Sequence, residues 1–297
     1  MQKTITQAAS NSDIPLSLSR PVAAWVTARA TITKNLQIAR RYLPNLVGSL
    51  LNIAVRMAFF LLLANAVTYQ TGHSQGLDLT GKGLFIFFQG ALLLFVFNSP
   101  TLWGPINAVS NDLYNGTLEY LYSNPCSRYA YYVGTVIAEV AVNLVVFLPL
   151  YLFLIFYSGL NLASTLMILI TCVMVLIALT AMGIMIAILA LLWRQVGSVA
   201  QVLGVLFEML AGAYLPISAF PQLVQYLAYL LPYTWGYDLI RYYSFSGSNA
   251  VGEWQTILPV WQEWGMLILY AILYTTISRY LLKKAELRAK RIGLHVI

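Results

Sequence analysis

The sequence predicts an all-α integral membrane protein with six transmembrane helices, and its composition is the first reason. Sixty per cent of the 297 residues are apolar and 9% are charged, whereas a soluble domain carries about 25% charged residues. The mean hydropathy is +0.73. The net charge of +7 does not indicate nucleic-acid binding, because the basic residues gather near the two ends of the chain, as they do when they set membrane orientation.

Six stretches are long and apolar enough to cross a bilayer, which requires roughly 20 residues. They lie at about 45–68, 84–108, 130–157, 163–192, 197–215 and 264–282. The segment between the last two is interrupted by prolines, and its apolar pieces are too short to cross. Irregular backbone at membrane depth is tolerated only inside protein or beside water. We therefore expect a re-entrant helical hairpin at about 216–250, within a single transmembrane domain over 44–283.

The distribution of Lys and Arg predicts that both termini are cytosolic. With six spans, 14 of these residues fall on one side and two, Lys82 and Arg241, on the other. Residues 1–43 contain no apolar core of the kind a signal peptide needs. This pattern indicates a multi-pass protein of a bacterial-type inner membrane. Residues 284–297 form a basic cytosolic tail.

The N-terminal segment is expected to contain an amphipathic helix over 20–43. On a 3.6-residue period one face collects apolar side chains, and basic residues remain available for lipid phosphates. The apolar face comprises Val22, Val26, Ile32, Leu36 and Leu43. This pattern favours a helix lying in the inner membrane interface, with membrane lipid as its partner. The alternative is a basic tether.

The stretch GLDLTGKG at 76–83 differs from a phosphate-binding loop at one position. The pattern requires Ser or Thr at the end, where Gly83 stands. A working loop joins a buried strand to a helix in a soluble domain. Here the stretch lies between two predicted spans on the outer face, so we interpret the match as coincidence. We expect no nucleotide site, cofactor or metal in this chain, and its two cysteines and two histidines suggest no metal cluster.

The cytosolic loop after the second span reads NDLYNGTLEYLYSNP, residues 111–125. Its apolar residues recur at helical spacing, Asn111 or Asp112 is a suitable cap for the start, and Asn124-Pro125 is a suitable end. A short capped helix with an apolar stripe fits a groove on a partner protein. The alternative is a helix lying on the bilayer surface.

This loop and a second block resemble the membrane subunits of ABC transporters of the type-2 export class. NGTLEYLYSNPCSRYAYYVG, residues 115–134, is similar to that family's cytosolic motif before the third span. LAGAYLPISAFPQLVQYLAYLLPYTWGYDLIR, residues 210–241, is similar to its fifth-span ending and re-entrant helices. The likeness extends over nearly the whole chain beyond residue 40. Some members carry a fused ATPase domain, for which this chain has no space.

The resemblance implies a half-transporter that pairs with a second copy or a paralogue. Separate cytosolic ATPase subunits would bind ATP and Mg, and residues 111–125 would be the coupling helix seated on them. The implied coupling residues are Asp112, Leu113, Gly116, Thr117, Leu118, Glu119, Leu121 and Arg128. It also implies that the second and fifth spans flank the translocation path. The candidate path residues are Phe95, Asn98, Leu206, Glu208, Met209, Tyr214 and Leu215. For Phe95 and its neighbour Phe97, packing or lipid contact is the strong alternative.

Three ionisable residues, Arg56, Glu139 and Glu208, lie within predicted spans. A charge at mid-membrane costs on the order of 3 kcal/mol, so each is expected to have a partner. Their similar depths allow Arg56 to pair with either Glu208 or Glu139. The outer segment is rich in Tyr and Trp, which we interpret as an interfacial belt rather than a sugar-stacking surface.

These features favour an ATP-driven export permease for an amphipathic, lipid-linked, glycan or drug-like substrate. The alternative is a secondary transporter driven by an ion gradient, supported only by the buried carboxylates Glu139 and Glu208. It predicts an internal repeat, and none is convincing. A membrane-embedded enzyme is the weakest reading, because the chain has no H-E-x-x-H or G-x-S-x-G motif.

Overall fold

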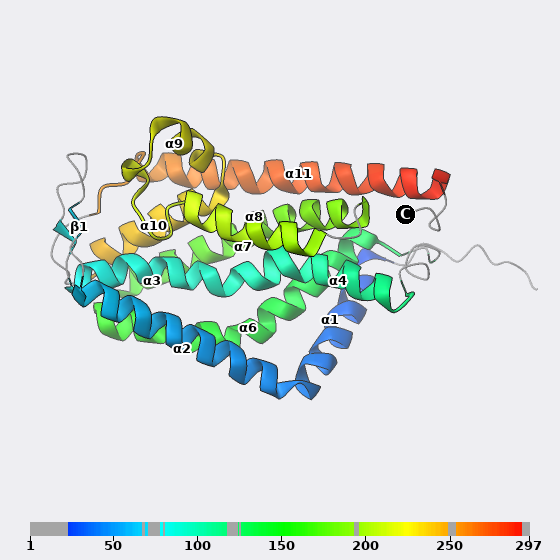
Figure 1. Cartoon of the computed structure of the whole chain (residues 1–297), viewed down its shortest axis with the longest axis horizontal. Coiled ribbons are helices and arrows are strands. Elements are labelled where there is room, and N and C mark those ends of the chain that lie inside the picture. The colour runs from blue at the N-terminus through cyan, green and yellow to red at the C-terminus, as the bar shows by residue number, and fades with distance from the viewer. Residues whose placement is uncertain are drawn as a thin grey trace, which may run out of the picture.

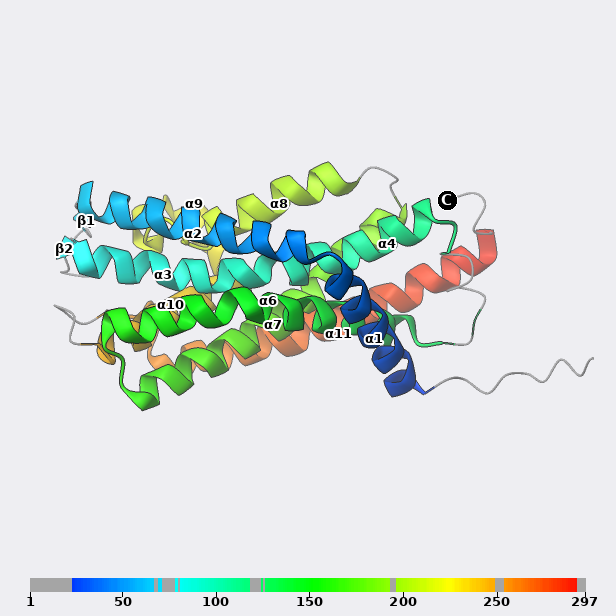
Figure 2. The ribbon, with the colours of Figure 1, turned by 90° about the horizontal axis from the view of Figure 1, so that it is seen from below.

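The computed structural model describes residues 23–66, 69–70, 78–79, 81–117, 124, 126–192, 196–248 and 254–292. Within these ranges the protein is a bundle of helices that run lengthwise beside one another (Figure 1). The sequence predicted no strand, but β1 (Tyr69–Gln70) and β2 (Asp78–Leu79) form a short antiparallel pair. We call the end of the bundle with β1, β2 and α9 the hairpin end. The opposite end, where α1, α4 and the last turns of α11 lie, is called the basic end (Figures 1 and 2).

Five helical segments in the described part of the chain are long and apolar enough to cross a membrane. They match five of the six predicted spans, and the elements that contain them are α2 (Leu43–Ala66), α3–η1–α4 (Gly81–Asn98, Ser99–Trp103, Gly104–Tyr114), α6 (Arg128–Ser158), α7 (Leu162–Leu192) and α11 (Val260–Ile292). The prediction of an all-helical membrane protein is thus confirmed in its coarse form.

The remaining predicted span, 197–215, is shorter in the structure. Helix α8 covers Val196–Leu210, because the chain turns at Gly212, whose φ of +84° favours glycine. The hydrogen bond from Ala213 N to Glu208 O closes this turn. A helix of 15 residues is short for a full crossing, so the sixth span stays a prediction.

The proline-rich segment forms three short helices at the hairpin end. They are η2 (Ile217–Ala219), α9 (Gln222–Tyr229) and α10 (Pro232–Ser246). Proline begins α10, where its missing N–H costs no helical hydrogen bond. The expected pair of short apolar helices is present, while its re-entry into a bilayer remains a prediction.

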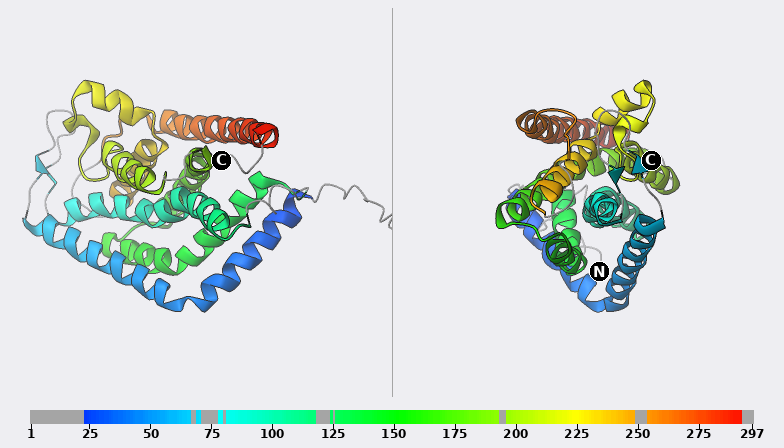
Figure 3. Two further views of the ribbon diagram at one scale, coloured as in Figure 1. Left: turned by 45° about the vertical axis from the view of Figure 1, so that its right-hand side comes forward. Right: turned by 90° about the vertical axis from the view of Figure 1, so that its left-hand side faces the viewer.

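Helix α3 lies inside the bundle and α2 lies on its edge. In the most apolar window of Gly81–Asp112, 88% of the residues are buried, against 6% for Leu46–Ala66. Viewed end-on, α3 is surrounded by the other helices (Figure 3). Helix α2 therefore presents most of its apolar side chains to lipid or to another protein.

Helix α1 (Ala24–Arg41) crosses α6 near the basic end (Figure 2). The two helices meet at Gly134, where an added Cβ would lie 2.9 Å from Ala28 O and 3.1 Å from Thr31 Cβ. The contact thus depends on small side chains rather than on the predicted apolar face. Val26 and Leu36 of that face are 53% and 38% exposed.

The five-residue π-helical segment η1 interrupts the long central helix at Ser99–Trp103. There Thr101 Oγ1 donates to Phe97 O at 2.6 Å. An added Cβ on Gly183 of α7 would lie 1.9 Å from Thr101 O, so the two backbones are in direct contact. This contact fixes the middle of the central helix against α7.

Candidate functional site

Arg56 of α2 faces α3 and the end of α8, and the structure brings it towards Glu208 rather than Glu139. Its guanidinium lies 3.7 Å from the centre of the Phe95 ring. Tyr214 donates to Glu208 Oε1 at 3.1 Å, and Arg56 interacts electrostatically with both groups. An arginine within an apolar helix therefore has both an aromatic face and a carboxylate nearby.

Six of the seven candidate path residues, all except Asn98, fall into two groups. Phe95, Glu208 and Tyr214 gather around Arg56, as described above. Leu206, Met209 and Leu215 lie on the surface, with 43%, 54% and 37% of their area exposed. The first group surrounds Arg56 with Glu208 buried and the other side chains half-buried, and the second is apolar and exposed.

Asn98 is buried, and its Oδ1 has no hydrogen-bond partner among the described residues. Phe97, next to it, packs against Phe147 with 4.7 Å between the ring centres. Phe97 is thus buried against α6, which agrees with the packing alternative.

The coupling segment does not begin where the sequence predicted. Asn111 and Asp112 lie in the last turn of α4 rather than at the start of a new helix. Gly116 has a φ of +65°, and Thr117 N donates to Asp112 O at 2.9 Å, which is the pattern of a Schellman motif. Asn115-Gly116 is thus a helix stop, a signal that glycine after a periodic segment gives in the sequence.

Asp112 ties this helix end to α6. Its carboxylate accepts hydrogen bonds from Tyr131 Oη at 2.5 Å and Thr117 Oγ1 at 2.9 Å. Leu118, Glu119 and Leu121 lie outside the described residues, and the side chain of Leu113 is likewise not described. Arg128, at the start of α6, is only 8% exposed and lines a small space beside Arg279 and Lys283 of α11.

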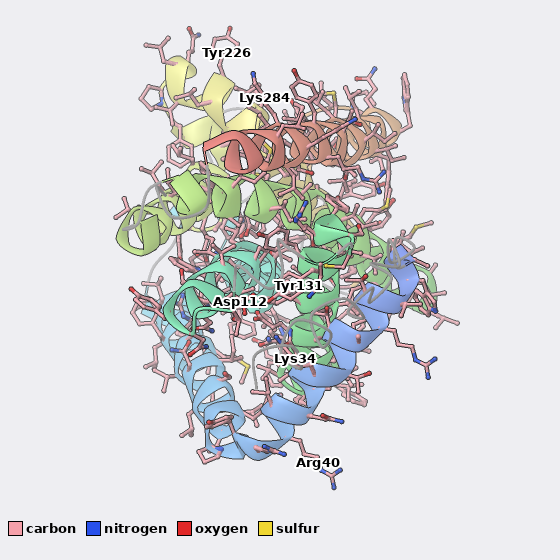
Figure 4. The ribbon with its side chains drawn as sticks, turned by 90° about the vertical axis from the view of Figure 1, so that its right-hand side faces the viewer. Lys34, Arg40, Asp112, Tyr131, Tyr226 and Lys284 are labelled. Carbon is pink, nitrogen blue, oxygen red and sulfur yellow. The ribbon has the colours of Figure 1, made fainter. Side chains whose placement is uncertain are left out.

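A cavity of about 880 Å³ lies at the basic end, between α1, α2, α4 and α6. Figure 4 shows three of its residues, Lys34, Asp112 and Tyr131, between α1, α4 and α6. Glu139 of α6 also lines the cavity, and its carboxylate rests against Gly104 of α4. An added Cβ on that glycine would lie 2.7 Å from Glu139 Oε2.

A buried polar cluster at the hairpin end was missed by the sequence analysis. Arg241 donates to Gly212 O at 2.7 Å and Ala213 O at 3.2 Å, and its guanidinium lies 3.6 Å from the centre of the Phe87 ring. Three residues after Asp238, it joins α10 to α3 and to the turn that ends α8. An Asp and an Arg at i, i+3 in an apolar segment are the signal that points to it.

Asp238 and Glu263 complete this cluster. Asp238 accepts from Trp254 Nε1 at 2.7 Å and Ile257 N at 2.8 Å, while Glu263, which lies beside it, accepts from Leu258 N at 3.1 Å. These bonds fasten the segment before α11 onto α10. The cluster satisfies buried backbone groups and therefore fits a structural role.

Some of the Tyr and Trp residues at the hairpin end are buried between helices, and others are exposed as in an interfacial belt. Tyr233 and Tyr237 are fully buried, and Trp235 is 2% exposed. Only part of the group, including Tyr226 and Trp261 at 68% and 74%, faces outward as a belt requires. The belt prediction is therefore wrong for the buried members, which pack between helices.

Comparison with known families decides what kind of bundle this is. The family model described as ABC-2 type transporter matches residues 25–245, about three quarters of the chain. The chain belongs to the ABC-2 type transporter family. Among curated proteins, none matches it. This ABC-2 type permease is thus a multi-pass membrane transport component, and the match extends from the first turn of α1 to the last turn of α10.

Proposed function

We propose that this chain is the permease half of an ATP-driven exporter, which pairs with a second permease and with separate ATPase subunits. The family match over residues 25–245 carries the proposal, and the long apolar helices support it. An amphipathic or lipid-linked cargo, a glycan or a drug-like molecule suits such a bundle. Both termini and the end of α4 would then face the cytosol. An ion-gradient mechanism is not favoured by this family.

The surface of α2 and α8 supports pairing. Few residues of α2 are buried, and Leu206 and Met209 of α8 are exposed beside it. A second permease seated there would cover this apolar area and leave the Arg56–Glu208 contact near the interface. ATP would drive transport only if it binds two arrangements of the assembly with different affinity.

The end of α4 is the proposed coupling point. The Schellman motif at Asn115–Thr117 stops the helix at the basic end, and Asp112 holds that end to α6. A partner that moves the segment following Thr117 would therefore move α4 and α6 together.

Copurification and hydrolysis test the proposal together. The tagged chain is extracted from native membranes in mild detergent, and its ATPase partner is identified and assayed. Glu119→Arg places a cation beyond the Schellman motif and should abolish the hydrolysis that depends on the permease. Asp78→Arg also replaces a carboxylate by a cation, but at the hairpin end, and should leave ATP hydrolysis unchanged. A chain that comes alone after crosslinking, without hydrolysis, would overturn the proposal.

A further inference from the structure

Among the described residues, Glu139 is the charged side chain of the basic-end cavity whose head group has neither a hydrogen bond nor an aromatic contact. The acidic and basic side chains that line the cavity are Lys34, Asp112 and Glu139. Asp112 is held by two hydroxyl groups, and Lys34 lies 5.6 Å from the centre of the Tyr131 ring. The carboxylate of Glu139 has no hydrogen-bond or ionic partner among the described residues.

Glu139 is nevertheless held in place. Its Oε2 rests against Gly104, a position where any larger residue would displace it. Its backbone carbonyl accepts from Asn143 Nδ2 at 2.9 Å, one turn along α6. A carboxylate positioned in this way within an apolar helix costs free energy unless a cation accompanies it.

The rest of the lining is suited to a polar organic group. Asn107 and Asn111 of α4 and Asn115, directly after it, recur every fourth residue, and all three amides line the cavity. Apolar side chains, among them Ile38 and Leu46, line it as well. Its volume of about 880 Å³ lies within the 300–1,000 Å³ typical of small-molecule sites.

A metal ion is a poor match for this chemistry. No group of three His, Cys, Asp or Glu residues suited to a metal occurs in the described part of the chain. The basic residue Arg40 of α1 points away from the bundle (Figure 4), so it does not balance Glu139. The arrangement of one carboxylate, several amides and apolar walls matches an ammonium group attached to an apolar body.

We propose that this cavity binds an amine-bearing amphiphile, with Glu139 as the counter-ion of its ammonium group. The inference rests on the proposed function only in treating this molecule as a cargo. The site itself lies between α1, α2, α4 and α6 of one chain, and neither Arg56 nor Glu208 lines it. Either an aminophospholipid headgroup or a free long-chain amine supplies the required chemistry.

Binding is measured on the full chain in dodecyl maltoside micelles, which carry neither charge nor amine. The probe is dansyl-1,8-diaminooctane, and its N-acetylated form is the neutral control. Fluorescence anisotropy should show at least tenfold weaker binding of the acetylated probe. Glu139→Gln should weaken binding of the amine at least tenfold and leave the acetylated probe unchanged, while Asp78→Asn at the hairpin end should change neither.

Two further variants separate charge from packing. Glu139→Asp keeps the charge and should bind the amine more tightly than Glu139→Gln does. Gly104→Ala keeps Glu139 but displaces its carboxylate, and should weaken binding of the amine only. Competition by phosphatidylethanolamine would identify a lipid headgroup as the occupant. If dodecylamine competes and phosphatidylethanolamine does not, the occupant is a free amphiphile.

Equal affinity for the amine and the acetylated probe, or full binding by Glu139→Gln, would overturn the site. Neither nucleotide nor ATPase is present, so this result is independent of the proposed function. If the chain binds the amine but the copurification experiment finds no ATPase partner, the site stands and the exporter proposal is rejected. ATPase stimulation by other molecules, without amine binding, would do the reverse.

Discussion

Gly183→Ala is the substitution whose effect the structure defines most sharply. The new Cβ would lie 1.9 Å from Thr101 O, whereas ordinary contact begins at 3.4 Å, so the shortfall is 1.5 Å. The obstacle is backbone rather than a flexible side chain, and α7 and η1 must therefore separate. Overpacking of this kind costs about 1–3 kcal/mol, and we take the upper end because backbone must move.

Helix propensity acts in the opposite direction. Alanine is favoured over glycine inside a helix by about 1 kcal/mol, so the net loss is about 2 kcal/mol. Gly265→Ala is the matched control, because its added Cβ meets nothing within 4 Å. It should be neutral or stabilise by up to about 1 kcal/mol.

Unfolding by sodium dodecyl sulfate in mixed micelles, followed by circular dichroism, measures both variants. Gly183→Ala should unfold at lower detergent fraction than the parent, and Gly265→Ala at the same or a higher one. If the two variants unfold together, the backbone contact at Thr101 is not what holds the central helix against α7.

Three other predictions follow from the contacts described. Tyr131→Phe removes a donor from the Asp112 carboxylate and should cost about 1–2 kcal/mol in the same titration; no loss would show that this bond is not formed. Arg241→Met leaves two buried carbonyls without their donor and should cost about 3 kcal/mol, whereas Arg279→Met should cost less than 1. Arg56→Gln and Glu208→Gln should show a coupling of about 1 kcal/mol in a double-mutant cycle, and additive effects would deny their interaction.

Hydrophobic length made the long helices predictable. The expected spans 130–157 and 163–192 differ from α6 and α7 by two residues or fewer at each end, because each helix coincides with a long, mainly apolar run of the sequence. The length of an apolar stretch does not predict a helix end that is set by backbone conformation. Helix α8 stops at Leu210 because the chain turns at Gly212, and the same stretch reads as continuous apolar sequence.

The candidate site was less predictable than the fold. The apolar spacing of residues 111–125 predicts a helix that includes Asn115-Gly116, whereas in the structure this pair ends α4. An Asn-Gly pair after a periodic segment is typical of a helix end. The place of Glu139 against Gly104 depends on how α4 and α6 pack, which no local pattern encodes. Arg56 had two candidate partners of similar depth, and only the packing of α2 beside α8 distinguishes Glu208 from Glu139.

The contact between Thr101 and Gly183 has a mechanical consequence for the central helix. At about 1.5 Å per residue, the arm from Thr101 to Gly81 is about 30 Å long and the arm to Asp112 about 17 Å. A rod held at that point is a lever with unequal arms. A displacement of about 1 Å at the basic end would move the hairpin end by about 1.8 Å in the opposite direction. If the central helix moved as a rigid rod about this contact, small movements at the basic end would be enlarged at the hairpin end.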